Sequence, residues 1–235
     1  MEEYEVLDAV EHSIGLLYLS RHRDRSDGWI YTVHIDGQLL MSSVSPLSER
    51  ELASRAISAH AGASQRILVG GLGLGYTAQA ALEDDRSAQV RVVDRMDFVI
   101  NWLRDGHLPL SEQLCDDPRL ELVLGDVYAD LLGPSQEKWD VILVDVDHAP
   151  DDPLDEQSLA FYTEEGQARV SEHLAPGGVI AVWSAWNNDA FAEVMERSYP
   201  EAWREHVVWW TAPEAEDGQR LHNLLFFGRK PGDDA

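Results

Sequence analysis

The sequence predicts an α/β fold, in which a doubly wound, mostly parallel sheet follows a small antiparallel β-sheet. Three observations lead to this prediction. From residue 65 onward, short strand-like segments alternate with helical ones, which is the pattern of strands joined by crossover helices. The runs ILVGG and VILVDV are continuously apolar, as expected of strands buried on both faces of a sheet. The segments before residue 46 are instead short strands separated by turns.

The first part of the chain, about residues 13 to 45, is expected to form a small antiparallel β appendage. IGLLYLS is apolar, and WIYTVHID alternates and is rich in β-branched and aromatic residues. Asp36-Gly37 is a strong hairpin-turn signal, and QLLMSS follows as the return strand. We therefore expect a small N-terminal β domain over residues 1–47 and a larger domain over residues 48–235.

The next segment, SPLSERELASRAISAHAG, predicts a helix at the start of the larger domain. Ser48 is expected to be its N-cap, and Glu51 three residues later would complete a capping box. Gly62 is expected to be the C-cap, because glycine readily adopts the left-handed conformation that ends many helices.

The remainder of the chain alternates between strands and helices. The predicted strands are RILVGG, QVRVVD, LELVLGD, WDVILVDVD and GGVIAVWSAW. The predicted helices are YTAQAALEDD, MDFVINWLRDG, EEGQARVSEHLA and DAFAEVMERSY. VVWWTA and LHNLLFFGRK are expected to form a terminal antiparallel pair. Ligands of open α/β sheets bind beyond the carboxyl ends of the strands, so the residues at these ends are the candidate site.

The charge of the chain excludes two classes of partner. It has 43 acidic and 18 basic side chains among 235 residues, a net charge of −25. Nucleic acids and anionic membranes need a basic surface, so we expect neither as a partner. The single cysteine and the scattered histidines form no ligand pattern, so no metal is expected. The acidic N-terminus and the absence of about 18 consecutive apolar residues predict a cytoplasmic protein.

The first candidate binding element is the loop GGLGLG, between a buried strand and a helix. Its glycines Gly71, Gly73 and Gly75 allow a tight turn and a close approach of a ligand to the backbone. Asp94 ends the next strand about 20 residues later, where a carboxylate can accept hydrogen bonds from both ribose hydroxyls. A helix cap is the alternative role for this acid. Together the two features predict a nucleoside-bearing cofactor, and NAD remains possible although the loop reads G-x-G-x-G.

Polar residues at other positions complete the predicted cofactor site. Asp126 ends the third strand and could accept a hydrogen bond from an adenine amino group. The backbone N–H of Val127 could bond the adenine ring, and Arg95 beside the ribose acid is included in the same set. The alternative is that Asp126 caps the following helix.

The fourth strand ends in DVDHAP, which supplies the catalytic candidates. Asp145 and Asp147 could bind a cationic ligand or take a proton from an attacking amine, and His148 titrates near neutrality. An ordinary polar surface loop is the alternative. Trp183 and Trp186 follow the fifth strand and could stack on a substrate or cation, although core packing explains them equally well.

These segments resemble the spermidine synthase (polyamine aminopropyltransferase) superfamily, and within it the short bacterial spermidine-synthase-like branch. The resemblance covers about residues 28 to 200 and is carried by GGLGLGYTA, VVDRMDFVINW, LPLSEQLCDDPRLELVLGDV, WDVILVDVDHAP and LAFYTEEGQARVSEHLAPGGVIAVWS. It implies a Rossmann-like, class I methyltransferase-type domain with a small N-terminal β domain, usually in a homodimer. It also implies S-adenosylmethionine or its decarboxylated form as ligand, held by the glycine loop, Asp94, Asp126 and Asp145.

The sequence departs from this family at three places. Gly73 stands where aminopropyltransferases carry, in a GGGDGG loop, an aspartate that holds the aminopropyl amine. DVDHAP replaces a DSTDP-like catalytic loop, so the second acid falls near Asp147 or His148. SPLSERELASRA lacks the Tyr-His pair that contacts polyamine in the family.

The expected function is therefore a spermidine-synthase-like transferase that moves a methyl or aminopropyl group to a small amine acceptor, expected to be cationic. A true polyamine aminopropyltransferase is one alternative. A non-catalytic homologue that binds the nucleoside or serves as a scaffold is the other.

Overall fold

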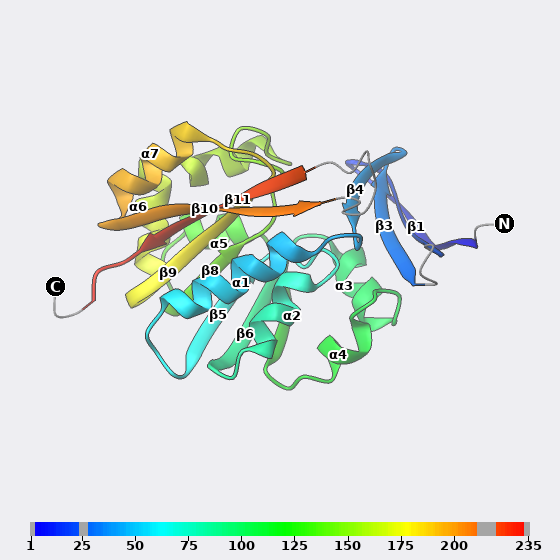
Figure 1. The fold of residues 1–235 in the computed structure, drawn as a ribbon, viewed down its shortest axis with the longest axis horizontal. Helices are drawn as coiled ribbons and strands as arrows, with labels where there is room; N and C mark the ends of the chain where they lie inside the picture. The colour runs from blue at the N-terminus through cyan, green and yellow to red at the C-terminus, as the bar shows by residue number, and fades with distance from the viewer. Residues whose placement is uncertain (1–2, 24–27, 211–219, 233–235) are drawn as a thin grey trace.

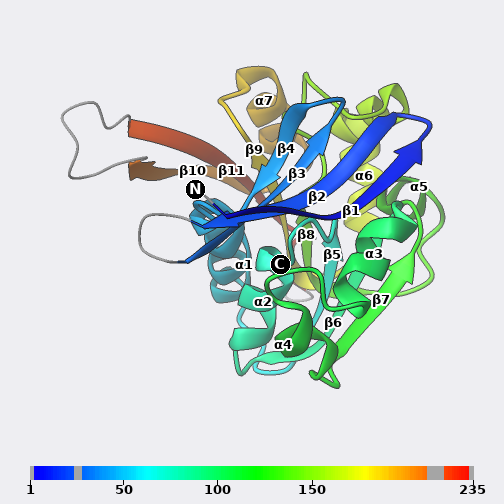
Figure 2. The same ribbon diagram turned by 90° about the vertical axis from the view of Figure 1, so that its right-hand side faces the viewer.

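The computed structural model describes residues 3–23, 28–210 and 220–232. In these residues the chain forms a four-stranded antiparallel sheet and a seven-stranded, mostly parallel sheet (Figure 1). The predicted α/β fold with a small N-terminal β-sheet is confirmed. Figure 2, viewed from the end of the molecule that carries the small sheet, shows β1 to β4 lying in front of the large one.

The small sheet has the strand order β1-β2-β3-β4. Its strands are β1 (Tyr4–His12), β2 (Gly15–Arg23), β3 (Trp29–Ile35) and β4 (Gln38–Ser42). Asp36 and Gly37 both have positive φ, 49° and 82°, as the predicted hairpin turn requires. The prediction that strands begin near residue 13 was wrong, because β1 lies before that point and pairs with β2.

The first strand is tied to the large domain as well as to its own sheet. The indole Nε1 of Trp102 donates a hydrogen bond of 2.6 Å to Asp8 of β1, and His12 packs edge-to-face on Phe98. Acidic residues dilute the alternation of this segment, which explains why the sequence pattern did not reveal the strand.

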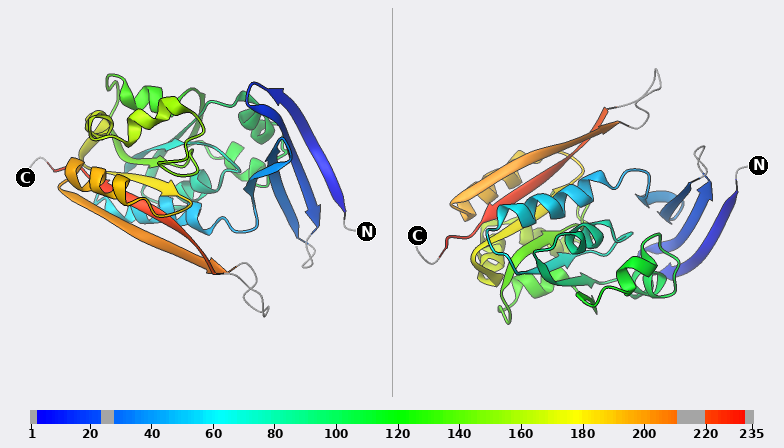
Figure 3. Two further views of the ribbon diagram at one scale, coloured as in Figure 1. Left: turned by 90° about the horizontal axis from the view of Figure 1, so that it is seen from above. Right: turned by 60° about the horizontal axis from the view of Figure 1, so that its bottom comes forward.

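The large sheet has the order β10-β11-β9-β8-β5-β6-β7. Its strands are β5 (Gln65–Gly70), β6 (Ser87–Asp94), β7 (Leu120–Leu124), β8 (Trp139–Val144), β9 (Leu174–Ser184), β10 (Glu201–Trp210) and β11 (Arg220–Arg229). Strands β5 to β9 run parallel to one another, and β11 pairs antiparallel with β9. β10 and β11 form the predicted antiparallel pair at one edge (Figure 3). The chain runs from β5 to β7 in one direction and from β8 to β9 in the other, so the strand order reverses between β5 and β8.

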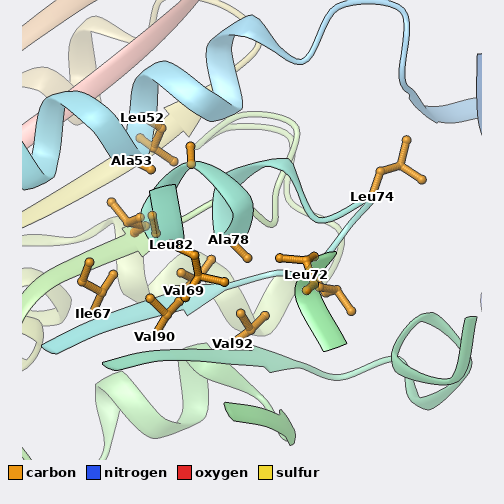
Figure 4. Packing of buried hydrophobic residues seen from close by; sticks show 14 of the residues in the cluster. Leu52, Ala53, Ile67, Val69, Leu72, Leu74, Ala78, Leu82, Val90 and Val92 are labelled. Atoms are coloured by element: carbon orange, nitrogen blue, oxygen red, sulfur yellow. The ribbon is translucent and has the colours of Figure 1, made fainter. Parts of the chain in front are cut away.

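Helices cover both faces of this sheet. They are α1 (Leu47–Ala59), α2 (Tyr76–Glu83), α3 (Asp97–Arg104), α4 (Ser111–Cys115), α5 (Val127–Leu132), the 3₁₀ helix η1 (Glu156–Tyr162), α6 (Glu164–His173) and α7 (Asp189–Ser198). Apolar residues of α1 and α2 pack with Ile67 and Val69 on one face (Figure 4), and those of α3 belong to the same cluster. Residues of α5, η1, α6 and α7 pack with Leu68 and Ile142 on the other. None of the described helices is both long and apolar enough to cross a membrane.

The caps of α1 differ from the prediction. Pro46 is the N-cap residue, and the Ser48 hydroxyl donates to Glu49 instead of capping the helix. Glu51 forms an ion pair with Arg55 one turn later, so the predicted capping box is wrong. The helix also ends before Gly62, with His60 as its extended C-cap residue. Because the helix begins two residues earlier than predicted, the serine falls inside its first turn, where its hydroxyl donates to the neighbouring Glu49.

Gly166, in the first turn of α6, allows this helix to pack closely on η1. Residues of η1 line the cavity described below. A Cβ at Gly166 would lie 2.1 Å from the Ala160 carbonyl oxygen and 2.8 Å from that of Phe161. We expect Gly166→Ala to lower the free energy of unfolding by about 1–3 kcal/mol, measured in urea. Gly232→Ala is the control, since its Cβ meets no atom of the described residues within 4 Å. Equal stability of the two variants would contradict this packing.

Candidate functional site

A cavity of about 670 Å³ lies beyond the carboxyl ends of β5, β6 and β8, and the small sheet forms part of its wall. This is a usual volume for a small-molecule site. Of the predicted site residues, the structure places on its wall Gly71, Gly73, Asp94, Arg95, Asp126, Val127, Asp145, Asp147 and His148. The remaining one, Gly75, does not line it.

All three predicted glycines of the loop have positive φ, at 90°, 51° and 93°. A Cβ at Gly71 would lie 2.2 Å from the Asp145 carbonyl oxygen, so only glycine lets the loop approach the end of β8. A Cβ at Gly75 would lie 2.6 Å from the Leu114 side chain, which gives this glycine a packing role. At Gly73 the nearest described atom outside the adjoining residues would be the Met41 Sδ, at 3.5 Å.

Asp94 fastens the end of β6 to the glycine loop. Its two carboxylate oxygens accept hydrogen bonds from the backbone N–H groups of Leu72 and Met96, both at 2.8 Å. Burial raises the pKa of Asp94, and these bonds act in the opposite direction. Its side chain does not cap α3, so the alternative of a helix cap is wrong. Arg95 extends to the cavity rim, where its guanidinium forms an ion pair of 3.1 Å with Asp155.

For Asp126 the helix-cap alternative is correct. Its Oδ1 accepts hydrogen bonds from the N–H groups of Tyr128 and Ala129 at the start of α5, at 3.0 and 3.2 Å. The same carboxylate lines the cavity, so capping the helix also fixes its position in the wall. Val127 is buried beside it, and its side chain fills the space that a Cβ at Gly70 would need.

Asp145 and Glu49 both line the cavity, and they form a pair because the charge of Glu49 acts on Asp145. The Thr77 hydroxyl donates a hydrogen bond of 2.6 Å to Asp145, and the Ser48 hydroxyl donates one of 2.7 Å to Glu49. Burial raises the pKa of Asp145 to about 7; the charge of Glu49 adds to this rise and the Thr77 bond opposes it. Burial likewise raises the pKa of Glu49.

The sequence did not identify Glu49 as part of the site. It lies on α1, outside the strand ends to which the prediction was restricted, and the expected capping box drew attention to Ser48 and Glu51 instead. One signal was available: this acid directly follows Ser48 and precedes Leu52, which are both buried, so it lies close to the face of α1 that packs inward.

Asp147 is buried and surrounded by hydrogen-bond donors. Its carboxylate accepts bonds from the hydroxyls of Tyr128 (2.7 Å), Tyr162 (2.9 Å) and Ser158 (3.0 Å), and from the Leu154 N–H (2.9 Å). These four bonds join α5, η1 and the loop between β8 and η1. The geometry therefore supports Asp147 as the anchor of this loop rather than as a free proton acceptor.

His148 is exposed at the mouth of the cavity beside the two tryptophans singled out in the sequence. Its ring lies edge-on to Trp186 and Trp183, with centroid distances of 4.9 and 6.4 Å. Trp183 lines the cavity, whereas Trp186 donates through its indole N–H to Asp151 at 3.1 Å. The structure thus brings the end of β8 and the end of β9 together at this rim.

Two curated proteins match the sequence, and both are named polyamine aminopropyltransferase. The one from Oceanobacillus iheyensis is 29% identical over 152 residues, 64% of this chain and 29% of its own length. The one from Aeropyrum pernix is 28% identical over 120 residues, 51% of this chain and 37% of its own length. The match thus spans about a third of the length of these curated relatives. No protein-family model matches the sequence.

Solved structures of spermidine synthases share the fold of this chain. The enzyme from Thermotoga maritima superposes with a TM-score of 0.69 at 17% identity, over 97% of this chain and 73% of its own. A spermidine synthase in complex with the transition-state analogue AdoDATO superposes with a TM-score of 0.70 at 19% identity, over 97% of this chain and 74% of its own. A probable spermidine synthase from Corynebacterium glutamicum superposes with a TM-score of 0.62 at 19% identity, over 96% of this chain and 80% of its own. The predicted resemblance to this superfamily is confirmed.

The four donors around Asp147 predict the cost of changing it. Asparagine keeps one acceptor oxygen but presents an NH₂ group to hydroxyls that donate in the native structure. We expect Asp147→Asn to lower the free energy of unfolding by about 1–3 kcal/mol, measured in urea. Asp152→Asn in the same loop is the matched control, because this side chain is exposed, and we expect its stability to be unchanged. A stable Asp147→Asn variant would contradict the anchoring role.

Proposed function

We propose that this chain, which resembles the spermidine synthase superfamily in sequence and fold, is an aminopropyltransferase that uses decarboxylated S-adenosylmethionine and a small amine. The observation that carries the proposal is the pair of carboxylates, Asp145 and Glu49, on the cavity wall. Such a pair attracts the ammonium groups of an aminopropyl donor and an amine acceptor. It repels the carboxylate that intact S-adenosylmethionine carries.

The strand ends supply groups suited to the nucleoside half of the donor. We assign the ribose hydroxyls to Asp94, whose carboxylate is held on the cavity wall by two backbone bonds. We assign the adenine to Asp126 and to the backbone of Val127. Gly71 and Gly73 have no side chains, so the donor chain can pass close to the backbone at these two positions.

In the proposed reaction the neutral nitrogen of the acceptor forms a bond to the aminopropyl carbon next to sulfur. The bond from that carbon to sulfur breaks, and its electron pair stays on sulfur, so methylthioadenosine leaves. The new secondary amine then carries one proton too many, which Asp145 accepts. A carboxylate with a pKa of about 7 suits this step, because it is ionised at slightly alkaline pH and still basic enough to take a proton.

Methyl transfer from intact S-adenosylmethionine is the second candidate. The observation that favours it is Gly73, which provides no carboxylate in the loop where aminopropyltransferases carry an aspartate. Glu49 and Asp145 weigh against it, because a donor carboxylate placed near two buried acids would be repelled.

The donor preference tests the proposal directly. We expect calorimetric titration at about pH 8 to show the decarboxylated donor binding at least about 10-fold more tightly than the intact one. Methylthioadenosine should also bind. Its formation from the decarboxylated donor should require an added amine. Tighter binding of the intact donor, with a methylated product, would establish the second candidate instead. If none of the three compounds binds, both enzymatic functions are wrong.

The pKa of Asp145 predicts the pH dependence of the reaction. Because the carboxylate form accepts the proton, the turnover rate should rise with pH and level off above about pH 7. We expect Asp145→Asn to lower kcat by about 10²–10⁴-fold, to abolish this rise, and to leave donor affinity within about 3-fold. Steady-state kinetics from about pH 5 to 9 measure the profile, with Asp152→Asn as the control. An unchanged profile in Asp145→Asn would show that another group takes the proton.

A further inference from the structure

We infer that the acceptor is a monoamine with an apolar body, and not a diamine or a longer polyamine. This inference rests on the proposed function and narrows its substrate class. It follows from how charge is distributed on the cavity wall: the acids come from the segments of the large domain, and the small sheet presents an apolar surface.

Most acids that line the cavity already have their hydrogen-bond donors. Asp94 and Asp126 each accept two backbone N–H groups. Asp147 accepts four bonds, and Asp155 accepts one from Gln157 N–H and pairs with Arg95. The acceptor oxygens of these carboxylates therefore have donors within the protein, and none of these acids belongs to the small sheet.

Glu49 and Asp145 differ from these acids. Each accepts a side-chain hydroxyl and lies in a buried environment close to the other, which disfavours two negative charges. The proposed reaction uses both of them. One carboxylate would face the ammonium of the donor, and Asp145 would face the acceptor nitrogen that loses its proton. A second ammonium at the far end of an acceptor that extends along the small sheet would need an acid there, and the described residues that this sheet adds to the wall are uncharged.

The wall formed by β2, β3 and β4 is apolar. Leu17 of β2 and Val33 and Ile35 of β3 line the cavity, the last two being alternate residues of one strand. The hairpin register shifts in β4, because Val33 pairs with Met41 while His34 pairs with Leu39. Leu40 is therefore an extra residue in the ladder, and both Leu40 and Met41 reach the cavity. The described residues that these three strands add to the wall are uncharged.

This wall selects against a second charge. Removing an ammonium from water onto an apolar surface without a counter-charge is strongly unfavourable. Each methylene buried there strengthens binding by about 4-fold. An acceptor that places its nitrogen at Asp145 and its remaining atoms on the small sheet gains from an aliphatic or aromatic body, and loses if that body ends in a second amine.

A pair of isosteric amines tests the inference in the unmodified protein. Heptylamine and 1,6-diaminohexane differ in a terminal methyl group in place of an ammonium. With saturating decarboxylated donor, we expect kcat/KM for heptylamine to exceed that for 1,6-diaminohexane by at least about 10-fold. Pentylamine and 1,4-diaminobutane should show the same order. Release of methylthioadenosine measures all four rates.

A gain of diamine activity tests the wall itself. Leu40→Glu would place a carboxylate on the apolar surface, and we expect the ratio of diamine to monoamine kcat/KM to rise by at least about 10-fold. Leu39→Glu is the matched control, since Leu39 is the preceding residue of β4 and is 60% exposed. We expect the control to keep the preference of the unmodified protein.

The outcomes separate this inference from the proposed function. If both diamines are better acceptors than their isosteric monoamines, the inference is overturned while aminopropyl transfer stands. If the aminopropyl group is transferred to none of the four amines, the proposed function fails and the inference fails with it. The comparison in the unmodified protein decides the matter even if Leu40→Glu does not fold.

Discussion

The burial of the Asp145 carboxylate is the constraint on which the rest of the site depends. Asp145 follows β8 at the point where the strand order of the large sheet reverses. The glycine loop comes so close to it that a side chain at Gly71 would collide with its backbone carbonyl. Thr77 of α2 donates to the carboxylate, and α1 brings Glu49 near it. Four separate segments thus meet around one acid, and each has to be accurately placed for the acid to stay buried.

The raised pKa of Asp145 lowers the stability of the folded protein at the pH at which the proposed reaction takes place. In the unfolded chain Asp145 would regain its ordinary pKa of 3.8, whereas in the folded chain the pKa is about 7. Between these values the native state holds a proton that the unfolded state has lost, so stability falls as the pH rises through this window. This loss of stability has to be offset by other interactions. The four hydrogen bonds of Asp147, two residues further along the chain, stabilise the same loop.

The sequence predicted the residues whose position follows from the sheet, and missed those that depend on how elements pack. Gly71, Asp94, Asp126 and Asp145 follow strands, so their convergence could be inferred from topology alone. Glu49 was not predicted because its place on the cavity wall depends on how α1 packs against the rest of the fold. The location of Asp147 could be predicted, but its four donors could not, because they come from α5, η1 and the intervening loop. Such contacts between distant segments leave no periodic trace in the sequence.

The same distinction bears on the departures from the family pattern. A motif compares residues at equal positions along the chain, and by that measure Gly73 removes a carboxylate from the glycine loop. Electrostatic attraction depends on where a charge lies in space, and α1 brings Glu49 to the wall of the same cavity. The net charge of −25 does not show which acids act in this way. What distinguishes Asp145 and Glu49 is that the charge of one acts on the other, while each accepts a hydrogen bond from one side-chain hydroxyl. This arrangement is a property of the fold, so the specificity of this site is determined by where its acids lie in space.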